Sequence, residues 1–152
     1  MNHNIRSFAR QIGAVLLLSP LLSAAAPEVS VFKTRTCGCC AKWVDHMRAN
    51  GFQVNVTDVP DTTAYRRKLG VPEGLDSCHT AVVGGYTLEG HVPSADVQRL
   101  LKTRPRKAKG LAVPGMPIGS PGMEQGERRQ AYTVVMFDAA GKSSQFQQYP
   151  AK

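Results

Sequence analysis

The sequence predicts an α/β fold: a thioredoxin-like β-α-β-α-β-β-α core followed by a C-terminal β-hairpin. Three observations lead to this prediction. Short segments that alternate apolar and polar residues are interleaved with segments of helical period. The motif CGCC, at residues 37–40, lies where the first strand meets the first helix. The length of 152 residues is that of one domain rather than two.

The first half of the chain beyond its leader predicts two strand–helix units. Residues 28–33 alternate apolar and polar side chains and predict a strand with one buried face. Apolar residues spaced i, i+3, i+4 and i+7 then predict a helix from the motif to the Asn-Gly pair at 50–51, a pair typical of helix ends. Residues 52–58 alternate again, and residues 62–69 predict a second helix.

The second half predicts a hairpin, a helix and another hairpin. Residues 81–83 and 86–89 predict strands joined by a Gly-Gly turn, and a third helix follows them. Between residues 104 and 126 glycine and proline recur without any period, which predicts a loop that carries two methionines. The strand-like segments 132–137 and 144–149 predict the final hairpin.

Residues 1–25 have the pattern of a secretory signal peptide. Two arginines precede an apolar run over residues 12–22, and small residues follow that run. The run is about half as long as a membrane-spanning helix requires. We therefore expect cleavage near Ala25 or Ala26, a periplasmic location, and a mature chain of residues 26–152 that forms one domain and is not integral to the membrane.

The formal net charge is +8, from 19 basic and 11 acidic residues. A basic cluster follows the predicted third helix and consists of Lys102, Arg104, Arg106, Lys107 and Lys109. No aromatic residues are interleaved with these charges, so in an exported chain a solvated linker is a better interpretation than a nucleic-acid site. We expect no nucleic-acid partner, and contact with anionic lipid headgroups or an acidic partner stays open.

Three of the four cysteines lie within the motif, at the start of the first helix. A helix N-terminus stabilises the thiolate, which is the form that attacks disulfides and binds soft metals. Cys37 and Cys40 are spaced as a redox pair, and Cys39 is a third thiol that such a pair does not need. Three sulfurs within one turn suit a soft cation. The alternative, which an oxidising compartment favours, is a simple Cys37–Cys40 disulfide with a spare buried cysteine.

The fourth cysteine and two histidines lie further along the chain. Cys78 and His79 precede the third strand, and in a thioredoxin-like arrangement that loop packs beside the motif. They replace the cis-proline usual at this position, which counts against ordinary disulfide exchange. His91 lies at the junction between the returning strand and the third helix, near the same place. A ligand role and an ordinary hydrogen-bonding or exposed role are both open for His91.

Two methionines, Met116 and Met123, lie in the Gly/Pro-rich loop, where no helix or strand period buries them. Thioether sulfur is a soft ligand, so both are candidate metal ligands. The alternative is that they fill gaps in the core, for which methionine is well suited. Thiolate and thioether together favour Cu(I), with room for more than one ion, because zinc accepts cysteine and histidine but gains little from methionine.

Four segments resemble the CopG-type periplasmic metal-binding family, a copper-resistance family long catalogued as a domain of unknown function. They are residues 36–40 with Trp43, residues 77–80, residues 90–93 and residues 110–124, and the resemblance extends from residue 28 to the final hairpin. It implies a thioredoxin-like fold, an association with copper resistance, and copper binding by clustered cysteines. The residues that it implies as copper ligands are Cys37, Cys39, Cys40 and Cys78, with His79, His91, Met116 and Met123 in support.

The leading hypothesis is an exported protein that binds Cu(I) through a multi-cysteine site, for copper tolerance or redox handling of copper, and that is not an enzyme in the ordinary sense. One alternative is a periplasmic thiol–disulfide oxidoreductase that uses Cys37 and Cys40. Another is a zinc-binding or metallochaperone module that passes its ion to a partner protein. The partners that we expect for the leading hypothesis are copper ions and another periplasmic copper protein. The sequence contains no Ser/His/Asp arrangement or phosphate-binding glycine loop that would indicate another chemistry.

Overall fold

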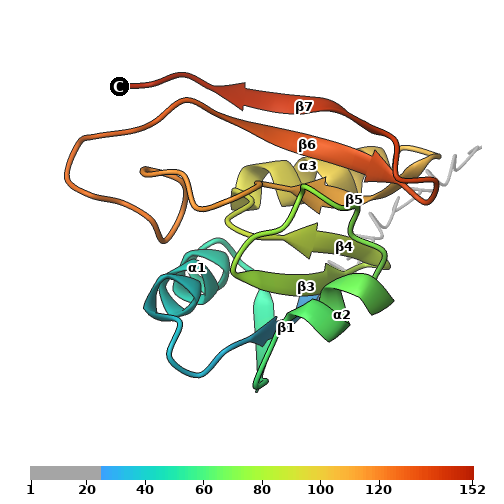
Figure 1. Cartoon of the computed structure of the whole chain (residues 1–152), viewed down its shortest axis with the longest axis horizontal. Coiled ribbons are helices and arrows are strands. Elements are labelled where there is room, and N and C mark those ends of the chain that lie inside the picture. Colours follow the sequence, from blue (N-terminus) through green and yellow to red (C-terminus); the bar gives the residue numbers. More distant parts are fainter. Residues whose placement is uncertain (1–24) are drawn as a thin grey trace, which may run out of the picture.

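The computed structural model describes residues 25–152, which form a seven-stranded mixed sheet with three helices (Figure 1). The predicted signal peptide lies outside the described residues, apart from Ala25. In chain order the elements are β1 (Glu28–Lys33), α1 (Gly38–Ala49), β2 (Gln53–Asp58), α2 (Thr63–Lys68), β3 (His79–Val83), β4 (Tyr86–Glu89), α3 (Ser94–Thr103), β5 (Ala108–Ala112), β6 (Tyr132–Asp138) and β7 (Ser143–Tyr149).

The strands lie in the order β2-β1-β3-β4-β5-β6-β7. β1 and β2 are parallel because α1 carries the chain back between them. β3 and β4 are antiparallel and are joined by Gly84 and Gly85, both at positive φ, as a two-residue hairpin turn requires. The predicted α/β class, the order of the first seven elements and the final hairpin are confirmed.

Strand β5 lies inside residues 104–126, where we expected a loop. It is an interior strand, parallel to β4 and antiparallel to β6. Gly110 is required in it, because a Cβ there would clash with the carbonyl oxygen of Thr87 and lie 2.7 Å from the ring of Phe137. Glycine in a sequence usually indicates a turn or loop, but here it allows a neighbouring strand to approach closely. The prediction of a loop over residues 104–126 was therefore wrong for β5.

The helices cover both faces of the sheet. Trp43, Val44 and Met47 of α1 pack with Val29 and Val31 of β1 in the main core. On the opposite face Phe32 stacks on Tyr65 of α2, with ring centroids 4.2 Å apart. Because side chains alternate along a strand, consecutive residues of β1 hold helices on opposite faces. Across the described part of the chain, no helix combines the length and apolar character needed to cross a bilayer.

Three chain segments meet at one end of the sheet. In the antiparallel pairing of β1 with β3, Lys33 lies opposite His79, and in that of β3 with β4, Thr80 lies opposite Glu89. The end of β1 leads into the cysteine motif, while β3 begins directly after Cys78. This register brings the loop before β3, the end of β4 and the start of α1 together, and the candidate site lies there.

Candidate metal centre

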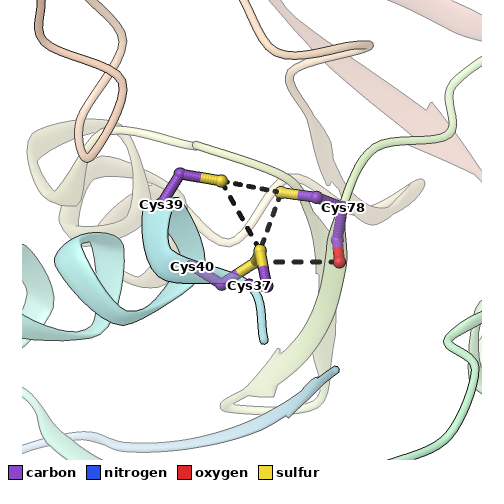
Figure 2. A group of neighbouring side chains, drawn as sticks. All are labelled: Cys37, Cys39, Cys40 and Cys78. Carbon is purple, nitrogen blue, oxygen red and sulfur yellow. Dashed lines mark hydrogen bonds between the residues drawn. A yellow bond between two sulfur atoms is a disulfide. The ribbon is translucent and has the colours of Figure 1, made fainter. Parts of the chain in front are cut away.

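The CGCC motif forms the first turn of α1. Cys37 is the N-cap residue, with extended backbone angles, and Gly38 is the first helical residue. One helical turn places Cys37 and Cys40 on the same side, and the two are joined by a disulfide (Figure 2). Cys39 is a free, half-buried thiol whose Sγ lies 3.5 Å from that of Cys37.

Cys78 reaches the motif from the loop before β3. Its Sγ lies 3.4 Å from the Sγ of Cys40 and 4.0 Å from the Sγ of Cys39. All four sulfur atoms lie within 4.8 Å of one another. Figure 2 shows the four side chains pointing toward one another. The structure therefore brings together the four cysteines that the sequence analysis named.

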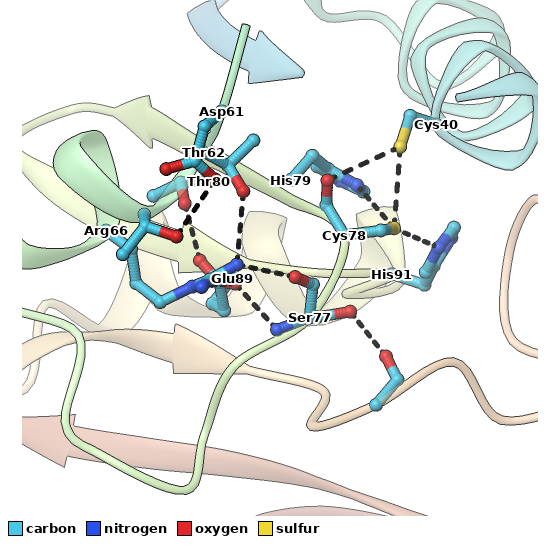
Figure 3. A network of polar contacts seen from close by, with 12 residues as sticks. Cys40, Asp61, Thr62, Arg66, Ser77, Cys78, His79, Thr80, Glu89 and His91 are labelled. Carbon is cyan, nitrogen blue, oxygen red and sulfur yellow. Dashed lines mark hydrogen bonds and ion pairs between the residues drawn. The ribbon is translucent and has the colours of Figure 1, made fainter. Parts of the chain in front are cut away.

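Two histidines lie on either side of the Cys78 thiol (Figure 3). The Nε2 atom of His91 lies 3.0 Å from the Sγ of Cys78, and the Nδ1 atom of His79 lies 3.4 Å from it. The Nδ1 atom of His91 lies 2.8 Å from the carbonyl oxygen of Pro121. A carbonyl oxygen only accepts hydrogen bonds, so Nδ1 of His91 carries the proton and Nε2 presents a lone pair to Cys78.

The imidazole of His79 is fully buried and lies against Trp43, with ring centroids 4.4 Å apart. Burial, reinforced by His91 and Lys33, lowers the pKa of His79 to about 3. Its Nε2 atom has no hydrogen-bond partner among residues 25–152. A neutral buried imidazole is the form that binds metals. Burial also lowers the pKa of His91, so both rings are neutral near pH 7.

The Cys78 thiol is held in its protonated form in the metal-free protein. Burial, together with the neighbouring Cys39, raises the pKa of Cys78 to about 12. Its S–H can donate to the lone pair on Nε2 of His91. A bound cation would reverse this preference, since a coordinated thiol loses its proton.

The donor set is that of a soft-metal centre. One group consists of the four cysteines, of which Cys37 and Cys40 become donors only when their disulfide is reduced, and a second consists of Cys78, His79 and His91; within each group the ligand atoms lie within 4.8 Å of one another. Thiolate and imidazole suit Cu(I) and zinc, whereas magnesium and calcium require oxygen ligands. The residues present therefore fit a thiophilic metal, and because the two groups share Cys78, they fit more than one ion.

The two methionines are placed differently. Met123 lines the same shallow pocket as Cys39, together with Lys42 and Glu124. The side chain of Met116 is 53% exposed. The structure therefore places Met123 in the lining of a pocket beside Cys39 and leaves Met116 exposed to solvent.

The loop that carries Met123 packs tightly on the start of α1. Gly122 has a φ of +87°, and a Cβ at this position would lie 2.7 Å from the carbonyl oxygen of Cys39 and 2.8 Å from the backbone nitrogen of Trp43. Together with the contact of Pro121 to His91, this holds the loop against the site. Residues 110–124 thus supply contacts around the cluster as well as the candidate methionine.

Sequence reasoning did not identify the polar residues that hold the loop before Cys78. Arg66 of α2 and Glu89 of β4 form a buried ion pair beside Ser77, as Figure 3 shows. The signal available in the sequence was a carboxylate that ends the buried strand β4, where an apolar residue or a turn residue is more usual.

The chain is similar to known proteins over most of its described length. A family described as "Protein of unknown function, DUF411" matches residues 75–123. No curated protein matches the chain. Two solved structures of a copper resistance protein, CopG, in forms designated 2 and 1, each share 44% identity with it and have a TM-score of 0.78. The similarity covers 82% of this chain and 99% and 98% of those two chains, respectively.

Proposed function

Because the chain belongs to the CopG-type copper-resistance family, we propose that it is a copper-binding protein whose cysteine cluster holds Cu(I), for copper tolerance or redox handling of copper. The observation that carries the proposal is the convergence of four sulfur atoms and two imidazoles at one point of the fold. Copper is the cargo in this proposal. The ligands are Cys37, Cys39, Cys40 and Cys78, with His79, His91 and Met123 in support, and with Met116 only if its loop moves.

The softness of the donors supports Cu(I) in particular. Thiolate sulfur binds Cu(I) and zinc, and the thioether of Met123 in the pocket beside Cys39 adds a ligand that Cu(I) favours. Both histidines are neutral near pH 7, so their lone pairs do not have to be freed from a proton. The two donor groups that share Cys78 support a capacity of more than one ion.

The disulfide couples metal capacity to the redox state of the protein. While Cys37 and Cys40 are joined, the free donors are two thiols, Cys39 and Cys78, and the two imidazoles. Exchange with an external dithiol, which supplies two electrons and two protons and is itself oxidised to a disulfide, reduces the Cys37–Cys40 bond and releases two further thiols beside them. Copper binding by all four cysteines therefore requires a reduced motif, and this supports the redox part of the proposal.

We further propose that the chain acts in the periplasm after removal of residues 1–25, and that the mature chain is a single thioredoxin-like domain. The order β-α-β-α-β-β-α with the motif at the start of α1 supports that interpretation. The proposed partners are copper ions and a second periplasmic copper protein. Contact of the basic cluster with an anionic membrane surface is a further proposal, and no nucleic-acid partner is proposed.

A thiol–disulfide oxidoreductase is the alternative that a specific observation favours, because Cys37 and Cys40 form a disulfide at a helix N-terminus. The position before β3, where disulfide-exchange proteins of this arrangement usually carry a cis-proline, is however occupied by Cys78 and His79. A thiol 3.4 Å from Cys40 would compete with any substrate thiol for the disulfide. A zinc-binding module would use the same donors and differ in the metal found, and a metallochaperone would use them and differ in passing its ion to a partner protein.

The test is metal analysis with thiol counting on protein purified from a periplasm supplied with both copper and zinc. We expect at least one copper per chain, little zinc, and thiols that are protected from alkylation until a Cu(I) chelator is added. Replacement of all four cysteines by serine should abolish the copper, while His46→Phe, which changes a histidine outside the donor groups, should leave it. A chain without copper that reduces a disulfide substrate would support the oxidoreductase instead.

A further inference from the structure

A buried ion pair lies directly behind the loop that carries Cys78. The Nε of Arg66 lies 2.9 Å from the Oε1 of Glu89, and the side chain of Glu89 is fully buried while that of Arg66 is 17% exposed. Arg66 belongs to α2 and Glu89 ends β4, so the pair links two elements that are separate in sequence (Figure 3). Neither side chain is among the proposed metal ligands.

The pair holds both backbone polar groups of Ser77, the residue before Cys78. The backbone N–H of Ser77 donates to the Oε1 of Glu89 at 2.8 Å. The Nη2 of Arg66 donates to the carbonyl oxygen of Ser77 at 2.6 Å. Such charge-assisted hydrogen bonds are stronger and shorter than those between neutral groups. Both backbone polar groups of the residue before Cys78 are therefore held by one ion pair.

The same carboxylate holds the chain on the far side of the metal-binding residues. The hydroxyl of Thr80 donates to the Oε2 of Glu89 at 2.6 Å. Glu89 thus holds Ser77 with one oxygen and Thr80 with the other, and Cys78 and His79 lie between these two points.

The shape of the guanidinium is part of the arrangement. Arg66 reaches Glu89, the hydroxyl of Thr62 and the carbonyl oxygen of Ser77 at the same time. A lysine ammonium in its place would keep the positive charge but could not reproduce this planar fork. Replacement of a buried ion pair by apolar residues often leaves stability unchanged, so a gain in stability alone does not explain the pair.

The geometry points to Arg66 and Glu89 as positioning residues that hold the Cys78 thiol against Cys39 and Cys40. They act through Ser77 and Thr80 and touch no ligand atom. The consequence for copper rests on the function proposed above, whereas the placement of the thiol can be measured without any metal.

The test of placement uses the double variant Cys37→Ser, Cys39→Ser, which leaves Cys40 and Cys78 as the two thiols of the cluster. Equilibration in glutathione buffers and peptide mass mapping give the effective concentration of the Cys40–Cys78 pair, whose sulfur atoms lie 3.4 Å apart. We expect Glu89→Gln and Arg66→Lys each to lower that effective concentration about tenfold or more, as displacement of a held reacting group does. Arg66→Lys keeps a positive charge beside the buried carboxylate of Glu89, so this variant should still fold if Glu89→Gln does not.

The matched control is Asp96→Asn, which removes a different partly buried ion pair, that of Asp96 with Arg99 at 2.9 Å. This change should lower the free energy of unfolding and leave the effective concentration within twofold of its parent. The positioning role would be overturned if Glu89→Gln and Arg66→Lys fold and leave the effective concentration unchanged. It would also be overturned if Asp96→Asn, at matched stability, lowers the effective concentration as much as they do.

A second measurement separates this inference from the proposed function. With all cysteines present, competition against a colorimetric Cu(I) chelator should show a loss of affinity in Glu89→Gln and Arg66→Lys similar to that in Cys78→Ser. If the placement of Cys78 changes in the variants while the unaltered protein binds no copper, the positioning role is supported and the copper function is contradicted. If copper affinity falls in Cys78→Ser but not in the two variants, the positioning role is contradicted and the copper function is supported.

Discussion

The carbonyl oxygen of Pro121 fixes the tautomer of His91. It accepts a hydrogen bond from Nδ1 at 2.8 Å and thereby leaves the Nε2 lone pair 3.0 Å from the sulfur of Cys78. A ligating histidine whose other nitrogen donates to a backbone carbonyl is a recurrent arrangement in metal sites. The loop after β5 therefore takes part in the site through its backbone.

His91→Phe should weaken copper binding by about tenfold to a hundredfold or more, since loss of a contact that only orients a ligand already costs that much. The change removes the lone pair and keeps a ring of similar volume in a buried position. Competition with a Cu(I) chelator measures the affinity. His46→Phe is the control, since His46 accepts the backbone N–H of Ser94 and lies outside the donor groups. Equal affinities of His91→Phe and the unaltered protein would remove His91 from the ligand set.

Cys39→Ser should reduce the number of copper ions bound per chain and leave the Cys37–Cys40 disulfide able to form. A redox pair needs two sulfurs, and the motif has a third that lies 3.5 Å from Cys37. Metal analysis gives the stoichiometry, and peptide mapping of the oxidised, metal-free sample gives the disulfide. Unchanged copper stoichiometry in this variant would contradict a site that uses all three thiols of the motif.

In the metal-free protein with the Cys37–Cys40 disulfide intact, the Cys78 thiol should react slowly with iodoacetamide near neutral pH, and its rate should keep rising up to about pH 12. Burial and the neighbouring Cys39 raise the pKa of Cys78 from 9.0 to about 12. A raised thiol pKa means that the folded protein binds the proton more tightly than the unfolded chain. The stability that follows is therefore complete below pH 9.0 and is lost as the pH rises through about 12.

Mass spectrometry of the Cys78 peptide at a series of pH values gives this profile directly. Addition of Cu(I) should suppress the reaction at every pH, because the thiolate is then coordinated. A rate that levels off at or below pH 9 in the metal-free protein would show that the thiol is not stabilised in its protonated form.

Acid should destabilise the metal-free protein through His79. Burial lowers the pKa of His79 to about 3 in the folded state, from 6.5 for the free side chain. The unfolded chain then takes up a proton that the folded protein does not, so this contribution to stability is present above pH 6.5 and is lost as the pH falls toward 3. Between pH 7 and pH 5 the loss amounts to about 2 kcal/mol.

Urea unfolding followed by the fluorescence of Trp43, the single tryptophan, measures this loss. The ring of Trp43 is fully buried against His79, so its emission reports unfolding of the site as well as of the core. His79→Gln should make the free energy of unfolding less dependent on pH in that interval. An unchanged slope in His79→Gln would assign the acid sensitivity to other groups.

Gly122→Ala should destabilise the protein and lift the Met123 loop from α1. The new Cβ would lie 2.7 Å from the carbonyl oxygen of Cys39, in addition to the strain of a non-glycine residue at positive φ. Gly126→Ala supplies the control, because Gly126 also has positive φ but has nothing within 4 Å of its Cβ position. We expect Gly122→Ala to cost about 1–3 kcal/mol more than Gly126→Ala, since overpacking adds to the backbone strain. Equal costs would show that the loop is not held by this contact.

Much of the fold could be predicted from the sequence because it depends on local periodicity. The alternation of β1 and the helical spacing after the motif show which side chains face the core, and these patterns need no knowledge of the neighbouring elements. The strand β5 could not be predicted in this way. Its Gly110 is explained only by the approach of Thr87 from β4, which is a long-range contact.

The candidate site likewise has features that depend on local spacing and features that depend on long-range contacts. The sequence by itself determined that Cys37 and Cys40 share one side of a helix start, because residues three apart are neighbours in a helix. The meeting of Cys78 with them was expected only through an assumed thioredoxin-like arrangement, and the pairing of Lys33 with His79 produces it in the structure. A strand pattern shows which face is buried and does not identify the neighbouring strand or its register.

Tertiary structure alone decided the remaining features of the site. It placed Met123 in the lining of a pocket beside Cys39 and left Met116 exposed, although both lie in one irregular loop. It also brought Arg66 of α2 and Glu89 of β4 together as an ion pair behind Cys78. A buried charge requires an oppositely charged partner, because an unpaired buried charge is strongly destabilising. The sequence does not identify that partner, since only the packing of α2 against the sheet brings Arg66 to Glu89.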